Sequence, residues 1–325
     1  MSDYSLKEYK ICFFTEGLTD DGQTFGCSAS DIAAGSIWNS NLGGSHSSAG
    51  NEPAVWDIRP RGMVIGGRYQ DVLDKIKIIM ESGFSPDAAI PVFARNEGIE
   101  RFLSRFSALT GDIPLCGGGA SPVSGGSDEG VLIPFAQNVN ILLIKDDRYI
   151  WSSDWKNFLT NTCEQGEKLY VRIASPRTIL SVRPDGENSD VPALQWYAEQ
   201  CLKYNVPEGC FEQIALAVKE GYNLHLSPEG EFALHTGSNV PPECILTTKR
   251  LIPDDFNRDI AEYCLQENRL IFSCAGLRSQ ITSSFTVGKK SIAGFFHGEV
   301  MGINGAAKFG NLMTSSLVAR IRRNY

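Results

Sequence analysis

The sequence lacks the short motifs that mark common catalytic, nucleotide and metal sites. Its four histidines form neither an HxH nor an HExxH spacing, so no zinc site follows from them. It has no GxSxG sequence, which excludes the nucleophile elbow of a serine hydrolase. The glycine-rich stretch CGGGASPVSGG has neither the GxGxxG nor the GxxxxGK[ST] spacing, and Pro122 stands where a phosphate-binding helix would begin. A nucleotide-binding loop is therefore excluded.

Long apolar runs and an excess of basic residues are also missing. No stretch approaches the roughly 18 apolar residues of a membrane-spanning helix, and the N-terminus has no signal-peptide pattern. Lys and Arg total 30 against 38 Asp and Glu, and the only basic cluster is Arg320, Arg322 and Arg323. The net charge of −8 disfavours a phosphate-backbone partner. We therefore expect a cytoplasmic protein with neither nucleic acid nor membrane as a partner.

Cysteine usage agrees with this compartment. The nine cysteines are an odd number, lie mostly within apolar runs and include no CxxC pair. Such a distribution predicts reduced, mostly buried thiols in an intracellular protein.

What is present is a globular composition, with 42% hydrophobic and 21% charged residues. Apolar residues at helical spacing predict helices, and short apolar or β-branched runs predict strands. In the first part of the chain the expected elements are a strand over 9–14, an ordered loop over 15–62, a helix over 68–82, a strand over 88–93, a helix over 98–109, a strand over 113–116 that is broken by glycines 117–119, and a hairpin-like pair over 130–135 and 138–144.

A similar order of elements recurs later in the chain. Helices are expected over 193–203, 256–266 and 277–285, and strands over 269–275, 291–296 and 313–321. Residues 69–117 and 254–297 therefore read as a duplicated helix–strand–helix–strand unit. The sequence predicts an α/β fold of two pseudo-repeated halves of mixed β-sheets flanked by helices, with halves at 1–180 and 181–325.

Several segments resemble the FIST family (F-box and intracellular signal transduction). IFSCAGLRS resembles the family's strand that ends in Cys-x-Gly-Arg, GFFHGEV its Gly-Phe-aromatic-x-Gly-Glu, and GNLMTSSLVARI its closing Asn-x-x-Thr strand. YVRIASPRTILSVRPDGENSDVPALQWYAEQCL resembles the junction between the FIST-N and FIST-C halves, and GDIPLCGGGAS a turn of the first half. The resemblance covers residues 63–325. The chain departs from the family pattern in two places. Leu277 stands between the glycine and Arg278, and the first sixty residues lack the family's opening helix.

The resemblance implies a sensory, small-ligand-binding protein rather than an established enzyme. Bacterial members are thought to bind small molecules such as amino acids, some members bind haem, and in eukaryotes the region occurs in a ubiquitin-ligase adaptor. We accordingly expect a small-molecule ligand, a signalling protein partner and no bound cofactor, haem being the alternative that the resemblance leaves open.

Strand ends that turn through glycine are where α/β proteins bind ligands, because the backbone approaches closely there. Arg278 can pair with a carboxylate and Glu299 with an ammonium group, so together they suit a zwitterion such as an amino acid. His297, Cys274 and Asn311 are expected nearby. The alternative interpretation is an internal ion pair between Arg278 and Glu299 that stabilises the fold.

The cysteines offer a second class of function. Cys116 and Cys274 occupy equivalent places in the two units, so either could be the nucleophile of a thiol-dependent enzyme with His297 as its base, or a small apolar filler at a strand end. His297 by itself could bind a metal or haem, but a lone histidine is more often a hydrogen-bonded core residue. An interaction scaffold is a third class, which a large exposed apolar patch would indicate.

Overall fold

The computed structural model describes residues 6–14, 21–29, 31–34, 37–38, 53–94, 97–121, 130–134, 136–161, 168–207, 213–219, 221–282, 284–303 and 305–322. The chain divides into two compact units. Unit 1 comprises residues 1–156, 260–309 and 314–325, and unit 2 comprises residues 157–259 and 310–313. The expected boundary after residue 180 falls inside strand β15 (Thr178–Pro184), so these units do not coincide with the two predicted halves.

Unit 1 is built on two large mixed sheets and two smaller ones. The first has seven strands in the order β1 (Lys7–Glu8), β7 (Arg61–Gly67), β11 (Val139–Ile144), β8 (Ala88–Phe93), β9 (Cys116–Gly119), β25 (Glu299–Ile303) and β26 (Ala306–Gly310). The second has five, in the order β12 (Tyr149–Asn157), β27 (Met313–Ile321), β22 (Arg269–Cys274), β24 (Ile292–Phe296) and β4 (Asp31–Ala34). The smaller sheets contain β10 (Leu132–Ile133), β3 (Thr24–Ser28), β2 (Lys10–Phe14) and β6 (Ala54–Val55), and β23 (Phe285–Thr286) with β5 (Ile37–Trp38). The predicted fold of mixed sheets flanked by helices is confirmed.

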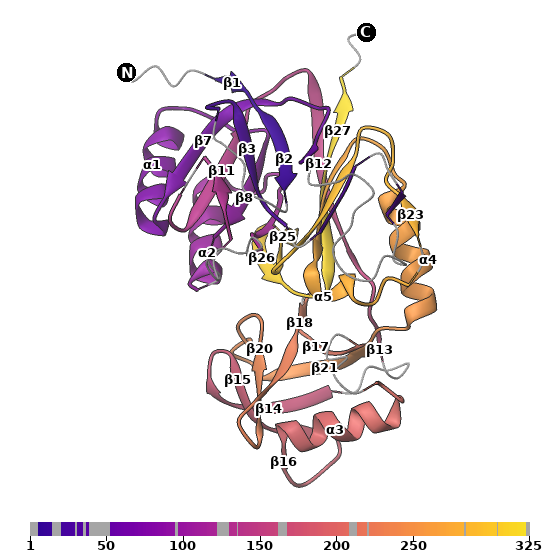
Figure 1. Ribbon diagram of the computed structural model, residues 1–325. Coiled ribbons are helices and arrows are strands. Elements are labelled where there is room, and N and C mark those ends of the chain that lie inside the picture. The colour runs from indigo at the N-terminus through magenta and orange to yellow at the C-terminus, as the bar shows by residue number, and fades with distance from the viewer. Residues whose placement is uncertain are drawn as a thin grey trace. The chain divides into compact units, whose positions relative to one another are not determined.

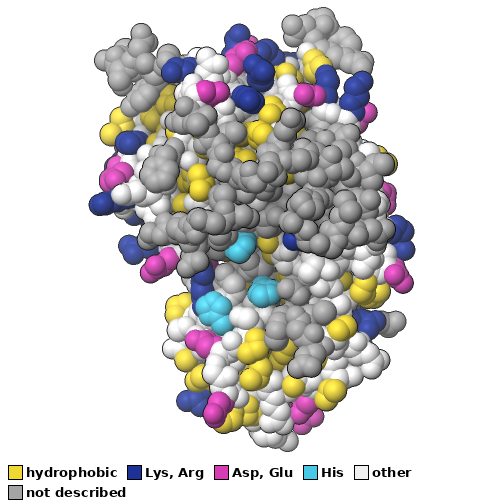
Figure 2. Space-filling view, in the orientation of Figure 1, with side chains coloured by type: hydrophobic (Ala, Val, Ile, Leu, Met, Phe, Trp, Pro, Cys, Tyr) yellow, Lys and Arg dark blue, Asp and Glu magenta, His cyan; other side chains and the backbone are white. Residues whose placement is uncertain are grey.

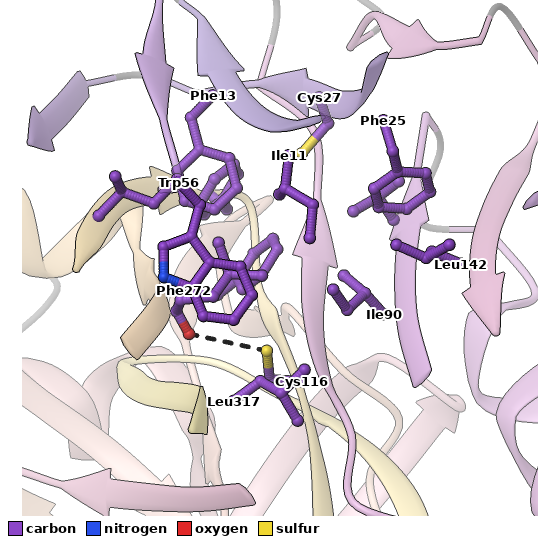
Figure 3. Packing of buried hydrophobic residues seen from close by; sticks show 14 of the residues in the cluster. Ile11, Phe13, Phe25, Cys27, Trp56, Ile90, Cys116, Leu142, Phe272 and Leu317 are labelled. Carbon is purple, nitrogen blue, oxygen red and sulfur yellow. Dashed lines mark hydrogen bonds between the residues drawn. The ribbon is translucent and has the colours of Figure 1, made fainter. Parts of the chain in front are cut away.

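Helices cover the outer faces of the two large sheets. α1 (Tyr69–Glu81) and α2 (Ile99–Thr110) lie together on one face of the seven-stranded sheet, and α4 (Pro253–Cys264) lies along the five-stranded sheet (Figure 1). The apolar stripe of α1, which includes Val72 and Ile76, packs against Ile141 of β11. The opposite face of that sheet packs on the other sheets through a second core with Phe13, Trp56 and Phe272, seen in Figure 3.

The two predicted repeat units have the same connection order. α1, β8, α2 and β9 correspond to α4, β22, α5 (Ala275–Arg278) and β24. β8 lies between an antiparallel neighbour, β11, and a parallel one, β9. β22 likewise lies between antiparallel β27 and parallel β24. The expected topology of the repeat is therefore present. The second helix of each repeat differs in length, because α5 has 4 residues where α2 has 12.

Four expectations about single elements are wrong. Residues 117–119 continue a strand rather than break one, because β9 is so close to its neighbours that a Cβ at Gly117 would overlap the carbonyl oxygen of Pro91. The segment 15–62 contains strands β3 to β6 in its described residues, not only loop. β10 pairs with β3 whereas β11 pairs with β7 and β8, so they form no hairpin. The helix expected over 277–285 is the short α5, which ends at Arg278.

Unit 2 is an antiparallel sheet with one helix on it. The strand order is β18 (Asn223–Leu224), β17 (Ile214–Ala217), β21 (Ile245–Arg250), β14 (Lys168–Ser175), β15, β20 (Ala233–Thr236) and β19 (Leu226–Glu229), with β13 (Thr160–Asn161) beside β21 and β16 (Val191–Pro192) beside β15. α3 (Ala193–Lys203) packs Trp196 and Tyr197 onto apolar side chains of β14, β15 and β17. Its bounds are those predicted from the sequence.

Candidate functional site

The predicted site residues follow two parallel strands that end side by side. β22 and β24 are hydrogen-bonded neighbours in parallel register, with Cys274 opposite Phe296 at their ends. Arg278 comes shortly after the first strand end, and His297 and Glu299 follow the second. Because both strands run in the same direction and are in register, these residues leave the sheet at the same edge. The strands that precede Arg278 and Glu299 are therefore adjacent in one sheet.

The chain crosses from one large sheet to the other at His297 and Gly298. The backbone N–H of His297 donates to the Gly119 carbonyl at 2.9 Å, and the Gly119 N–H donates to the Gly298 carbonyl at 3.1 Å. Gly298 has φ +91, and a Cβ there would overlap the ring of Phe309. Only glycine fits this crossing without strain, which explains why the apolar run of β24 stops where it does.

Glu299 is a fully buried carboxylate at the first position of β25. Its partner in the antiparallel β9 is Gly118, and directly opposed residues project to the same face of a sheet. A Cβ on Gly118 would lie 3.2 Å from Cδ1 of Phe272 and 3.3 Å from Cβ of Phe296. Glu299 therefore projects from the face that is turned toward these aromatic rings. In such surroundings a carboxylate is costly to bury unless its charge is compensated.

Cys274 and Arg278 lie at the two ends of α5. Cys274 is buried and precedes the helix, while Arg278 is its last residue and is half-buried. α5 contacts both β22 and β24, so it keeps Arg278 at the edge where these strands end. Arg278 therefore follows β22, whereas Glu299 follows β24 and belongs to β25 of the other large sheet. Their roles in binding a ligand stay a prediction.

His297 follows the end of β24, and its side chain is exposed to solvent. The protein around its imidazole nevertheless removes enough water to lower its pKa. The neutral ring is therefore the favoured form near neutral pH, and it can either donate or accept one hydrogen bond at each nitrogen.

Cys116 is not placed as a nucleophile. Figure 3 shows it among Ile90, Phe272 and Leu317 in the apolar core, where it is completely buried. Its Sγ lies 3.8 Å from the Leu270 carbonyl oxygen, to which the thiol donates. Burial raises the pKa of the thiol well above its ordinary value, and the charge of Asp154 raises it further. The thiol therefore stays protonated, and it belongs to the core.

Asn311 belongs to unit 2, whereas the other five predicted site residues belong to unit 1. Its backbone N–H donates to the Asn223 carbonyl at 3.1 Å, and its Oδ1 accepts a hydrogen bond from the Ser238 hydroxyl at 2.9 Å. The side chain is buried. These bonds give Asn311 a structural role within unit 2.

A partly buried polar cluster in unit 1 was not anticipated. Asp154 on β12 accepts hydrogen bonds from Tyr263 at 2.5 Å, Arg269 at 2.8 Å and Ser316 at 2.5 Å. The Arg269 guanidinium also lies 4.9 Å from the centre of the Tyr263 ring. Burial, followed by the charge of Asp154, raises the pKa of Tyr263. The sequence signal that could have revealed this cluster is Arg269 at the first position of an otherwise apolar strand. An arginine has to be paired if it is buried.

Other titratable groups give no metal centre in the part of the chain that the structure describes. No group of three or more His, Cys, Asp or Glu side chains there could hold a metal ion. His225 in unit 2 has a lowered pKa, mainly through burial and then through the charge of His235. The seven cysteines among the described residues carry free thiols.

Among the described residues on the face shown in Figure 2, basic and acidic side chains are interspersed. Within the described ranges, no helix is long and apolar enough to cross a membrane.

The fold defines an α/β protein with several mixed sheets flanked by helices. No family model matches the chain, and no curated protein matches it.

Proposed function

We propose that the protein is a small-ligand-binding sensory module that acts in cytoplasmic signal transduction through a protein partner. Unit 1 binds an amino-acid-like zwitterion at the shared edge of β22 and β24. Arg278 binds the ligand carboxylate, Glu299 the ammonium group, and His297 and Cys274 line the site. The signalling role and the compartment follow from the resemblance to FIST proteins and from the composition of the chain.

The observation that carries this proposal is the register of the two parallel strands. It places the ends of β22 and β24 side by side; Arg278 follows the first of these ends, and Glu299 follows the second after a crossing where the backbone has to be glycine. Opposite charges that follow neighbouring strand ends match the two ends of an amino acid.

The two other classes of function find less support. A thiol enzyme needs an accessible thiolate, whereas Cys116 is buried with a raised pKa and Cys274 is only 5% exposed. An interaction scaffold needs a contiguous apolar patch. The largest exposures among apolar side chains in the described residues are those of Leu202 on α3, Ile321 on β27 and Phe232 in the turn between β19 and β20.

A thermal-shift screen of the full chain with the common L-amino acids tests the proposal. A ligand that binds only the folded protein stabilises it, by about 2.7 kcal/mol at a hundred times its dissociation constant. We expect at least one amino acid to raise the melting temperature, and its decarboxylated amine and its N-acetyl derivative to raise it much less. A screen without any shift, or equal shifts by the amine and the amino acid, contradicts the proposal.

Arg278→Gln separates the roles of the two charges. It removes the group proposed for the carboxylate, so we expect it to weaken binding of the amino acid and to leave the weak binding of the amine unchanged. Arg101→Gln, on the exposed side of α2, is the matched control and should change neither.

A further inference from the structure

Unit 1 contains a cavity of about 480 Å³ between two of its sheets and the first turn of α1. Its walls come from the region around β3 on one side, from the ends of β7 and β11 on the other, and from the start of α1 at the rim. This volume lies within the range of roughly 300–1,000 Å³ that is usual for small-molecule sites.

The floor of the cavity holds a buried acceptor. Asn140 is completely buried, and its Nδ2 donates to the Pro134 carbonyl. Its Oδ1 receives no hydrogen bond from any residue in the described ranges. Asn140 lies directly opposite Gly66 in the pairing of β11 with β7, and a Cβ at position 66 would overlap Oδ1. Gly66 also lines the cavity, so glycine at this position leaves room for the amide oxygen next to the cavity wall.

A buried amide oxygen without a donor is costly, and a ligand that supplies a donor offsets the cost. The side chains next to Asn140 in the cavity wall, Val64 and Ala136, are apolar. An ammonium group placed there would lose its water without meeting a negative charge, whereas a hydroxyl loses much less. The floor therefore favours a hydroxyl donor over an ammonium group.

The rim presents a cation. Arg68 is the N-cap residue of α1, a helix of 13 residues, and its side chain makes no capping hydrogen bond. Its Nε donates to Oε1 of Gln137 at 2.8 Å, and both side chains line the cavity. The positive end of the helix dipole and the guanidinium both favour an anion at this place. Asp71, in the first turn of α1, adds one negative charge at the rim, which favours a singly charged carboxylate over a doubly charged phosphate.

We propose that this cavity binds a small hydroxycarboxylate, with the carboxylate at Arg68 and a hydroxyl donating to Oδ1 of Asn140. The volume suits a chain of several hydroxylated carbons, as in an aldonate. This site is distinct from the edge of β22 and β24 and does not rest on the function proposed there.

Calorimetric titration of the full chain with D-gluconate, D-glucitol and hexanoate tests the assignment. Glucitol keeps the hydroxyls and lacks the carboxylate, and hexanoate keeps the carboxylate and lacks the hydroxyls. We expect saturable binding of gluconate and at least about tenfold weaker binding of the other two, since each loses one set of hydrogen bonds. Absence of saturable gluconate binding at millimolar concentration, or equal binding of hexanoate, overturns the proposal.

Two variants test the two contacts separately. Arg68→Gln, at an exposed position, should weaken gluconate binding by about 10- to 100-fold, the range for a hydrogen bond to a charged group. Asn140→Ala should weaken it by about 2- to 10-fold and leave hexanoate binding unchanged. Because Asn140 is buried and its variant can fail to fold, the Arg68 variant decides the test, with Arg101→Gln as the matched control. Unchanged gluconate affinity in Arg68→Gln overturns the proposal.

Discussion

The ion pair of Asp154 and Arg269 should respond unequally to removal of its two members. The Arg269 side chain is 9% exposed and that of Asp154 is 43% exposed, with Nη1 of Arg269 2.7 Å from Oδ2 of Asp154. Asp154→Ala leaves a buried guanidinium without a carboxylate. Arg269→Met leaves a carboxylate that water can reach and fills most of the apolar volume.

Stranding one member of a buried pair costs about 3–5 kcal/mol. Because the Asp154 side of the pair is open to water, we expect the lower end of this range, about 3 kcal/mol, for Asp154→Ala. For Arg269→Met we expect about 1–2 kcal/mol, near the value of the hydrogen bonds that are lost. In the double variant no buried charge is left unpaired, so it should be less destabilised than the sum of the single variants.

Urea unfolding, followed by circular dichroism and tryptophan fluorescence, measures these free energies. An Arg269→Met variant that is destabilised as much as Asp154→Ala, or a double variant equal to the sum, would refute the reasoning.

Two further outcomes are expected. Iodoacetamide should modify the half-buried Cys201 in the folded protein and leave Cys116 unmodified, because Cys116 is buried with a raised pKa. Peptide mass spectrometry measures the modification of each cysteine. Alkylation of Cys116 in the folded protein would contradict this prediction. Burial lowers the pKa of His225, so the unfolded chain binds its proton more tightly and stability should fall as the pH drops below about 6.5. In His225→Gln the free energy of unfolding should depend less on pH in this window, and an unchanged slope would show that other groups cause the loss.

Much of unit 1 could be predicted because its helices are long and amphipathic. The apolar positions of α1, such as Val72 and Ile76, recur at helical spacing and are buried as expected. The order of helix and strand around β8 and β22 could also be predicted, and the two strands have corresponding neighbours in their sheets.

The failures have local and long-range causes. In α5, Ser279 donates its hydroxyl to the Gly276 carbonyl, and the following Thr282 and Ser284 are poor helix formers, so the helix does not continue. The glycines of β9 read as a break, since only the tertiary structure shows that neighbouring strands leave no space for a Cβ.

The site could be predicted only in part. The strand ends that precede Arg278 and Glu299 follow from the repeat, but the crossing between sheets at Gly298 depends on Phe309, which no local pattern reveals. The contact of Asp154 with Arg269 joins residues 115 positions apart, beyond the reach of periodicity.

The most direct test of the proposed function is Glu299→Gln, compared with wild type in two measurements on the same preparation. The first is the melting temperature without ligand, and the second is calorimetric affinity for the amino acid that gives the largest shift in the screen. Glu81→Gln, at an exposed position of α1, is the control. We predict binding weaker by about 1.5–3 kcal/mol with a nearly unchanged melting temperature. A fall of several degrees in melting temperature with unchanged affinity would instead make Glu299 part of a buried structural pair, whose loss costs up to about 3–5 kcal/mol.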